Sequence, residues 1–143
     1  MNRSVLIVED SAQLAEMEAA IVRLSGGCPT VVADGADALS ALSETTYDLI
    51  VLDLGLPRVD GQAVLDRLAA EEAWQRIPVI VVSGEIDRLR PTPQVVGAFP
   101  KPFDAIALSN AIRRALGEEA TPSEADVAEP ETVADFVTIV AGS

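Results

Sequence analysis

The 143-residue sequence contains no histidine and a single cysteine, Cys28. The absence of histidine excludes a histidine-based catalytic triad, a histidine-bound metal ion and a phosphohistidine within these residues. A single cysteine excludes an internal disulfide and a cysteine-cluster metal site, and it favours a reducing compartment. Cys28, Tyr47 and Trp74 have no neighbours in the sequence that suggest chemistry, so we interpret them as packing residues.

Long apolar runs are also absent, and none approaches the roughly 20 residues that span a bilayer. The first apolar run, Val5 to Val8, closes in Glu9-Asp10 rather than in small residues, which is not typical of a signal peptide. We therefore expect a cytoplasmic protein without a membrane partner.

Basic residues are scarce, because 23 acidic residues face only ten basic ones and the formal net charge is −13. This balance argues against a nucleic-acid partner, since neutralising phosphates requires a basic surface. Nine of the ten basic residues are arginine, and Lys101 is the only lysine. A lone lysine indicates a role for a compact point charge, although a genome that prefers arginine would also leave few lysines.

Short apolar runs alternate with helical stripes through the first 117 residues. Strands are expected at 5–8, 30–33, 49–52, 77–82 and 95–99. Helices are expected between them, with Ser11 as N-cap of the first and Asp104 as N-cap of the last. The connection at 85–94 contains Pro91 and Pro93, so it should be a short helix or an irregular loop. Strict alternation predicts an α/β fold with a doubly wound, five-stranded parallel sheet.

The expected helices carry apolar stripes that should face the sheet. The first combines Leu14, Met17, Ile21, Val22 and Leu24 and should stop at Gly26-Gly27, the third should reach Trp74, and the last includes Ile106, Leu108 and Ile112. Pro100, at the end of the fifth strand, lacks a backbone donor. It is tolerable only at a strand end or on an edge strand.

Residues 118–143 form an acidic extension beyond the expected domain of residues 1–117, with seven acidic residues and no basic one. Val133, Phe136, Val137 and Val140 follow the i, i+3, i+4, i+7 spacing of a short amphipathic helix at 131–140. Such a helix would need to dock on this domain, on a second copy or on a partner. The alternative is a solvated acidic tail.

Acidic side chains follow two of the apolar strands. Asp53 comes directly after the run at 49–52, and Glu9 and Asp10 follow the first strand. Ligands of open α/β sheets bind at the carboxyl ends of the strands, so these carboxylates should share a cleft. Carboxylates at that distance repel one another unless a cation lies among them, and their oxygens suit Mg²⁺. The plainer interpretation is that Asp53 only caps the following turn.

Ser83 and Lys101 follow the two remaining long strands and would offer a hydroxyl and a positive charge to an incoming anion, while Gly84 leaves room. Carboxylates are established nucleophiles for phosphoryl groups, and a metal ion with a lysine would offset the charge on the transferred group. This set of residues therefore predicts phosphoryl transfer onto Asp53.

Taken together, these motifs resemble the receiver domain of two-component response regulators over about residues 3 to 117. The residues that carry the resemblance are Glu9-Asp10, Asp53 with Pro57 and Asp60-Gly61, Ser83-Gly84, and Lys101-Pro102-Phe103. The resemblance implies a flavodoxin-like (CheY-like) fold with strand order 2-1-3-4-5.

For the chemistry, the resemblance implies that a sensor histidine kinase or a phosphotransfer protein phosphorylates Asp53, giving 4-aspartylphosphate, with Ser83 and Lys101 contacting the phosphoryl group. Asp10, Asp53 and the carbonyl of Gly55 would hold Mg²⁺, and Glu9 would assist through metal-bound water. No enzymatic activity is implied beyond the Mg²⁺-dependent phosphorylation and dephosphorylation of the chain itself.

The sequence departs from the family in the region linked to output. Receivers usually carry an aromatic switch residue three positions before the lysine, where this chain has Ala98, and Phe99 comes one place later. The atypical FAT GUY receivers have a hydroxyl residue followed by glycine and an unusual fourth helix. Ser83-Gly84 and the proline-containing connection at 85–94 resemble them in part.

We expect a single-domain response regulator of a phosphorelay that signals to an unknown downstream protein through protein contacts, since the tail is too short and acidic for a helix-turn-helix. A homodimer is left open. One alternative is a receiver-like interaction module that works without phosphorylation. A phosphatase of the haloacid dehalogenase type is a weaker one, because Gly55 stands where a second aspartate is needed.

Overall fold

The computed structural model describes residues 3–117, and the extension with its expected helix at 131–140 lies outside the described residues. Five strands alternate with four α-helices and one 3-10 helix, η1. The strands are β1 (Arg3–Val8), β2 (Gly27–Val32), β3 (Leu49–Leu52), β4 (Val79–Ser83) and β5 (Val95–Pro100). The helices are α1 (Ala12–Leu24), α2 (Gly35–Glu44), α3 (Gly61–Ala70), η1 (Ile86–Arg88) and α4 (Ala105–Ala115).

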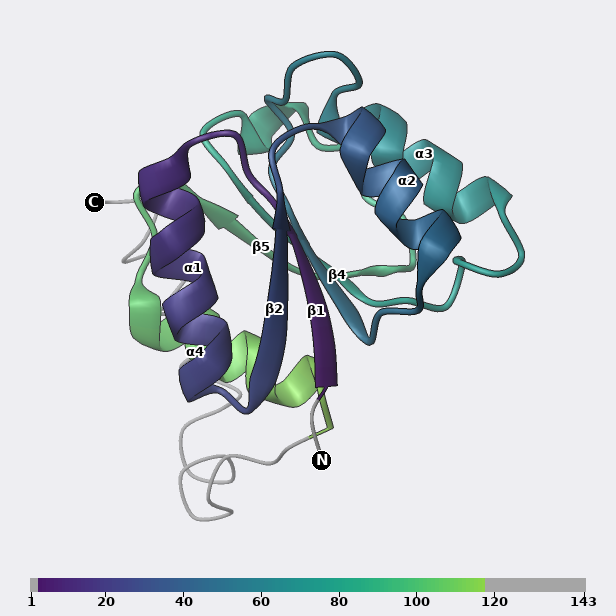
Figure 1. Cartoon of the computed structure of the whole chain (residues 1–143). Coiled ribbons are helices and arrows are strands. Elements are labelled where there is room, and N and C mark those ends of the chain that lie inside the picture. Colours follow the sequence, from purple (N-terminus) through teal and green to yellow (C-terminus); the bar gives the residue numbers. More distant parts are fainter. Residues whose placement is uncertain (1–2, 118–143) are drawn as a thin grey trace.

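The five strands form one parallel sheet in the order β2-β1-β3-β4-β5, which confirms the expected doubly wound topology. Helices α1 and α4 cover one face of the sheet, and α2 and α3 cover the other (Figure 1). The chain moves outward from β1 to β2 and then crosses to β3 on the other side of β1. The carboxyl ends of β1 and β3 thus flank the switch point where open α/β sheets bind ligands.

The central strands are buried on both faces, which explains why their sequences are continuous apolar runs. Alternate residues enter two separate cores because side chains point to opposite faces along a strand. Leu6, Val8, Ile50 and Leu52 belong to the core under α2 and α3, whereas Val5, Ile7, Leu49 and Val51 belong to the core under α1 and α4.

Helix ends follow the capping residues in the sequence. The hydroxyl of Ser11 accepts from the backbone N–H of Leu14 at 3.3 Å, and the carboxylate of Asp104 accepts from Ile106 and Ala107 at 2.8 and 3.0 Å. Both expected N-caps are confirmed. These caps fix where α1 and α4 start relative to the strand ends.

Some expected boundaries and faces were wrong. The second strand begins at Gly27 rather than at residue 30, the fourth begins at Val79 and includes Ser83, and α3 ends at Ala70, before Trp74. Met17, Leu24 and Ile106 are 47%, 78% and 69% exposed, so they do not belong to the buried stripes. In α1 the buried residues are Ala15, Glu18, Ala19, Ile21 and Val22, so Ile21 and Val22 of the expected stripe are buried and small alanines complete the buried face.

The connection from β4 to β5 holds only the single turn η1, as the two prolines indicated. Both strands that contain proline lie at sheet edges: Pro29 is in β2 and Pro100 closes β5. An edge strand leaves one row of backbone donors unpaired, so the missing N–H is tolerated there. No helix between residues 3 and 117 combines the length and apolar character that crossing a bilayer requires.

Candidate functional site

The ends of β1 and β3 place two acidic side chains next to each other. The backbone N–H of Asp53 donates to the Val8 carbonyl at 3.1 Å, so pairing continues one residue past β3. Glu9 follows Val8 directly, and Glu9 and Asp53 are only 2% and 6% exposed. Two carboxylates are thereby buried side by side at the switch point of the sheet.

Asp10 completes a cluster with these two residues. One carboxylate oxygen from each of Glu9, Asp10 and Asp53 lies within 4.8 Å of the others, and Asp10 is exposed at the mouth. Carboxylate oxygens are the hard ligands that Mg²⁺ prefers, and Mg²⁺ commonly takes one or two protein carboxylates. The donor set therefore fits this ion.

Lys101 reaches the cluster from the end of β5. Its Nζ lies 2.7 Å from Oε1 of Glu9 and 2.8 Å from Oδ2 of Asp53. The backbone N–H of Lys101 donates to the Ser83 carbonyl at 3.2 Å, which fixes the lysine beside the end of β4. The Lys101–Pro102 peptide is cis. The only lysine of the sequence thus sits between the two buried carboxylates.

Burial and charge act in opposite directions on these groups. Burial raises the pKa of Glu9, and the hydrogen bond from Lys101 offsets only part of this rise. Burial lowers the pKa of Lys101, but the hydrogen bonds to Asp53 and Glu9 outweigh it and leave that pKa raised. The ammonium form of Lys101 is therefore stabilised in the site.

The loop after Asp53 holds the aspartate in place. The backbone N–H of Gly55 donates to Oδ1 of Asp53 at 3.1 Å. The N–H of Gly61 donates to the Leu54 carbonyl at 2.8 Å, and a side chain at Gly61 would collide with the Asp53 backbone carbonyl. Glycine at position 61 is required because the start of α3 lies directly against this loop.

Ser83 is fully buried at the end of β4, and its Oγ accepts from the backbone N–H of Glu85 at 3.0 Å. Within residues 3–117, its side chain makes no hydrogen bond to Asp53 or Lys101. A side chain at Gly84 would meet no atom within 4 Å. Within this range the Ser83 hydroxyl is thus not bonded to either charged group, and Gly84 leaves open space next to it.

Glu18 is a buried acidic residue that sequence reasoning missed. It lies on α1 with 2% exposure, and its Oε2 has no hydrogen-bond partner among the described residues. Burial, with repulsion from Glu9, raises the pKa of Glu18 to about 8. A signal was present: Glu18 is three residues from Ala15 and four from Val22, which places it on the buried face of α1.

Position 98, where receivers usually carry an aromatic switch residue, differs in its environment from position 99. Ala98 is exposed on the edge strand β5, whereas Phe99 is partly buried and packs against the core under α1 and α4. Neighbouring residues of a strand point to opposite faces, so the ring at 99 cannot replace a ring at 98.

A family model described as the response regulator receiver domain matches residues 5–113. The chain is 36% identical over 87 residues to the DNA-binding response regulator MtrA of Mycobacterium tuberculosis, covering 61% of this chain and 37% of that protein. It is 37% identical over 128 residues to the sensory transduction protein RegX3 of Mycolicibacterium smegmatis, covering 85% of this chain and 54% of that protein. The chain thus spans about a third to a half of the length of these relatives.

Solved structures agree on the fold. The receiver domain of a Pseudomonas aeruginosa sensor histidine kinase, solved with a magnesium ion in its active site cleft, is 27% identical with a TM-score of 0.70, covering 82% of this chain and 100% of that chain. The chemotaxis response regulator CheY4 of Vibrio cholerae is 22% identical with a TM-score of 0.71, covering 81% of this chain and 100% of that chain, and shows the fold alone.

The fold, the strand-end acids with their lysine, and the family match over residues 5–113 agree. The chain belongs to the response regulator receiver domains of two-component signalling.

Proposed function

We propose that this receiver accepts a phosphoryl group on Asp53 from a sensor histidine kinase or a phosphotransfer protein and passes the signal on through protein contacts. The observation that carries the proposal is the position of Lys101, whose Nζ contacts both Glu9 and Asp53 at 2.7 and 2.8 Å. A buried carboxylate held beside an ammonium group is suited to attack a phosphoryl group, because the same ammonium offsets charge on the incoming oxygens.

In the proposed step, one carboxylate oxygen of Asp53 forms a bond to phosphorus as the bond from phosphorus to the donor imidazole nitrogen breaks. The donor nitrogen takes up a proton, and Asp53 becomes an acyl phosphate. The Gly55 N–H, 3.1 Å from Oδ1, keeps the side chain oriented. The buried hydroxyl of Ser83 would donate to a phosphoryl oxygen on the opposite side of the group from the acidic cluster.

We assign direct contact with Mg²⁺ to Asp10, Asp53 and the Gly55 carbonyl, and contact through water to Glu9. The convergence of the three carboxylates within 4.8 Å supports this set. When bound, Mg²⁺ would offset the negative charge of the phosphoryl oxygens. The residues of the chain orient the acceptor, and we expect no activity beyond the phosphorylation and dephosphorylation of the chain itself.

Phosphorylation by acetyl phosphate with Mg²⁺ tests the proposal directly. Intact-mass measurement should show one added phosphoryl group on the wild type and none on Asp53→Asn. Asp48→Asn is a matched control, because Asp48 is an exposed aspartate that precedes β3 whereas Asp53 follows it. Modification of Asp53→Asn to the same extent as the wild type would overturn the assignment.

The alternative is a receiver that binds its partner without phosphorylation. The single turn η1 between β4 and β5 and the exposed Ala98 favour it, because both alter the region that couples a receiver site to its surface. Partner affinity that is the same with and without acetyl phosphate, and the same for Asp53→Asn, would select this alternative. The partial resemblance to FAT GUY receivers stays a prediction, and so does the absence of a nucleic-acid partner.

We further propose that residues 1–117 form the receiver unit and that 118–143 are appended to it. Leu116 supports this boundary, because it is 1% exposed and is the last residue of the core under α1 and α4 that the structure describes. Gly117, which follows, has a φ of +79°, a conformation that glycine adopts without strain at a helix end.

A further inference from the structure

A groove of about 430 Å³ runs between α1 and α4, on the face of the sheet opposite α2 and α3 (Figure 1). Ile21 and Leu24 line it from α1, and Ile106 and Arg113 line it from α4. Leu24 and Ile106 are 78% and 69% exposed, although both are large and apolar. Two such side chains facing one groove form an apolar surface that a partner segment could cover.

The groove also carries positive charge in a chain whose net charge is −13. Arg113, in the last turn of α4, is the charged residue among the described residues that line it. Arg113 donates to the Leu24 carbonyl at 3.4 Å and forms no ion pair with a carboxylate of residues 3–117. Neither α1 after Glu18 nor α4 contains an acidic residue, so the surroundings of the groove favour an acidic occupant.

The chain itself supplies a segment with matching chemistry. Residues 118–143 contain seven acidic and no basic residues, and within them Val133, Phe136, Val137 and Val140 repeat at helical spacing. An apolar stripe flanked by carboxylates complements a groove of aliphatic side chains that includes the guanidinium of Arg113. The pattern corresponds to a helix that lays its apolar face into a groove.

The connection is long enough. Residue 117 follows α4, which lines the groove, and residues 118–132 separate it from Val133. Sixteen residues, extended, reach at most about 53 Å, whereas the eleven residues of α4 are only about 16 Å long. A tethered segment also has an effective concentration of roughly millimolar, so a few apolar contacts suffice for docking.

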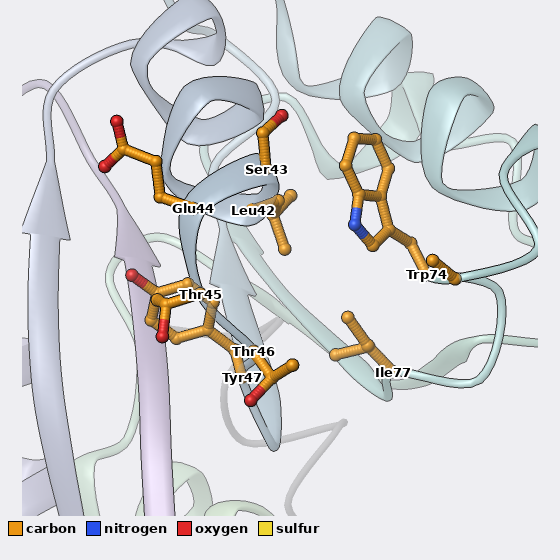
Figure 2. A pocket seen from close by; sticks show the side chains of 9 residues that line it. Leu42, Ser43, Glu44, Thr45, Thr46, Tyr47, Trp74 and Ile77 are labelled. Carbon is orange, nitrogen blue, oxygen red and sulfur yellow. The ribbon is translucent and has the colours of Figure 1, made fainter.

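A second groove, of about 340 Å³, lies on the other face of the sheet and is lined by Leu42, Tyr47, Trp74 and Ile77 (Figure 2). Glu44 also lines it, and Figure 2 shows its carboxylate directed away from Trp74 and Ile77. Within residues 3–117 the lining contains no arginine or lysine, so the second groove is less suited to an acidic segment. The groove is therefore the internal comparison for the test.

We propose that the segment 131–140 binds in the groove between α1 and α4, with its apolar positions on Ile21, Leu24 and Ile106 and its acidic residues near Arg113. The proposal does not depend on phosphorylation of Asp53, so either can fail without the other.

Hydrogen exchange measured by mass spectrometry on the full chain tests it. Amides at 131–140 should exchange at least about tenfold more slowly than in a free peptide of the same sequence. Leu24→Asp and Ile106→Asp should each remove this protection, and Phe136→Asp should do the same from the other side. Both groove positions are exposed, so exchange within the sheet should not change. High salt and Arg113→Gln should weaken the protection.

Ala73→Asp is the matched control, because Ala73 is an exposed residue of the second groove. Protection that survives Leu24→Asp and Ile106→Asp but is lost in Ala73→Asp would overturn the proposal in favour of the Trp74 groove. Protection that falls on dilution would overturn it in favour of a second copy. Exchange at 131–140 as fast as in the free peptide would exclude docking altogether.

Discussion

Asp53 and Glu18 are both buried carboxylates, 6% and 2% exposed, but the chain surrounds them differently. Asp53 has the ammonium of Lys101 at 2.8 Å and the N–H of Gly55 at 3.1 Å. Glu18 forms no salt bridge within residues 3–117, one of its oxygens has no hydrogen-bond partner there, and its pKa is raised to about 8. The comparison teaches that burial, together with repulsion from Glu9, raises the pKa of a carboxyl group that has no salt bridge within residues 3–117, whereas Asp53 lies in an ion pair with Lys101.

The largest effect is expected from removing Lys101, the cation that pairs with Asp53. Lys101→Met leaves Glu9 and Asp53 adjacent without the ammonium that contacts both. Phosphorylation of Asp53 by acetyl phosphate should slow by about 10²- to 10³-fold, which is typical when one oriented donor to developing charge is lost. Time courses of intact mass with Mg²⁺ measure this rate.

Lys101→Arg is the conservative control, because it keeps the charge but changes the shape of the donor. We expect its rate to lie between those of the wild type and Lys101→Met. An unchanged rate in Lys101→Met would contradict the role given to this residue.

Glu18→Gln tests the raised pKa of Glu18 through the pH dependence of the unfolding free energy. The folded protein retains the Glu18 proton up to about pH 8, whereas the unfolded chain releases it near pH 4.5. The contribution of Glu18 to the unfolding free energy is therefore fully present below pH 4.5 and declines as pH rises to 8, by a total on the order of 5 kcal/mol.

Urea denaturation at several pH values without added Mg²⁺ measures this decline. The difference in unfolding free energy between Glu18→Gln and the wild type should change across this window, because the amide does not titrate. Parallel curves for the two proteins would show that Glu18 keeps an ordinary pKa.

Ser83→Ala should have a smaller effect, because it removes a neutral donor rather than an ion. The hydroxyl is fully buried and accepts from the Glu85 N–H at 3.0 Å, so its position is well defined. One neutral hydrogen bond to the phosphoryl group corresponds to about a tenfold change in rate. The same time course measures it, with Ser83→Thr as the variant that keeps the hydroxyl.

The smallest effect is expected at an exposed ion pair. Arg90 and Asp66 lie 3.2 Å apart, with side chains 71% and 56% exposed. Water and salt screen such a pair, so Arg90→Met should change the unfolding free energy by no more than about 0.5 kcal/mol and leave phosphorylation unchanged. Urea denaturation of Arg90→Met and of Lys101→Met compares an exposed ion pair with a buried one. A large loss of unfolding free energy in Arg90→Met would contradict this comparison.

The sequence predicted the sheet and the contents of the site because both depend on short-range patterns. Continuous apolar runs mark the buried parallel strands, and residues directly after them must gather at one edge of the sheet. For this reason the sequence alone groups Glu9, Asp10 and Asp53, whose carboxylates lie together in the structure. The family resemblance added the strand order, which the alternation of elements does not determine.

Helix faces were predicted less well. The expected stripe of α1 relied on large side chains, and two of them, Met17 and Leu24, are exposed, while Glu18 is buried. Ala15 and Ala19 are also buried, and their small size gives little signal in hydrophobic patterns. The exposed pair of Leu24 and Ile106 that lines the groove was hidden for the same reason.

The sequence by itself therefore determined the order of the strands and helices along the chain, the caps at Ser11 and Asp104, and the acids that end the strands, because each depends on neighbouring residues. Only the tertiary structure decided that one lysine contacts both Glu9 and Asp53, that Glu18 is buried with Oε2 unpaired among residues 3–117, and that a groove opens between α1 and α4. These features depend on the distances between elements far apart in the sequence, and packing of the whole core sets those distances.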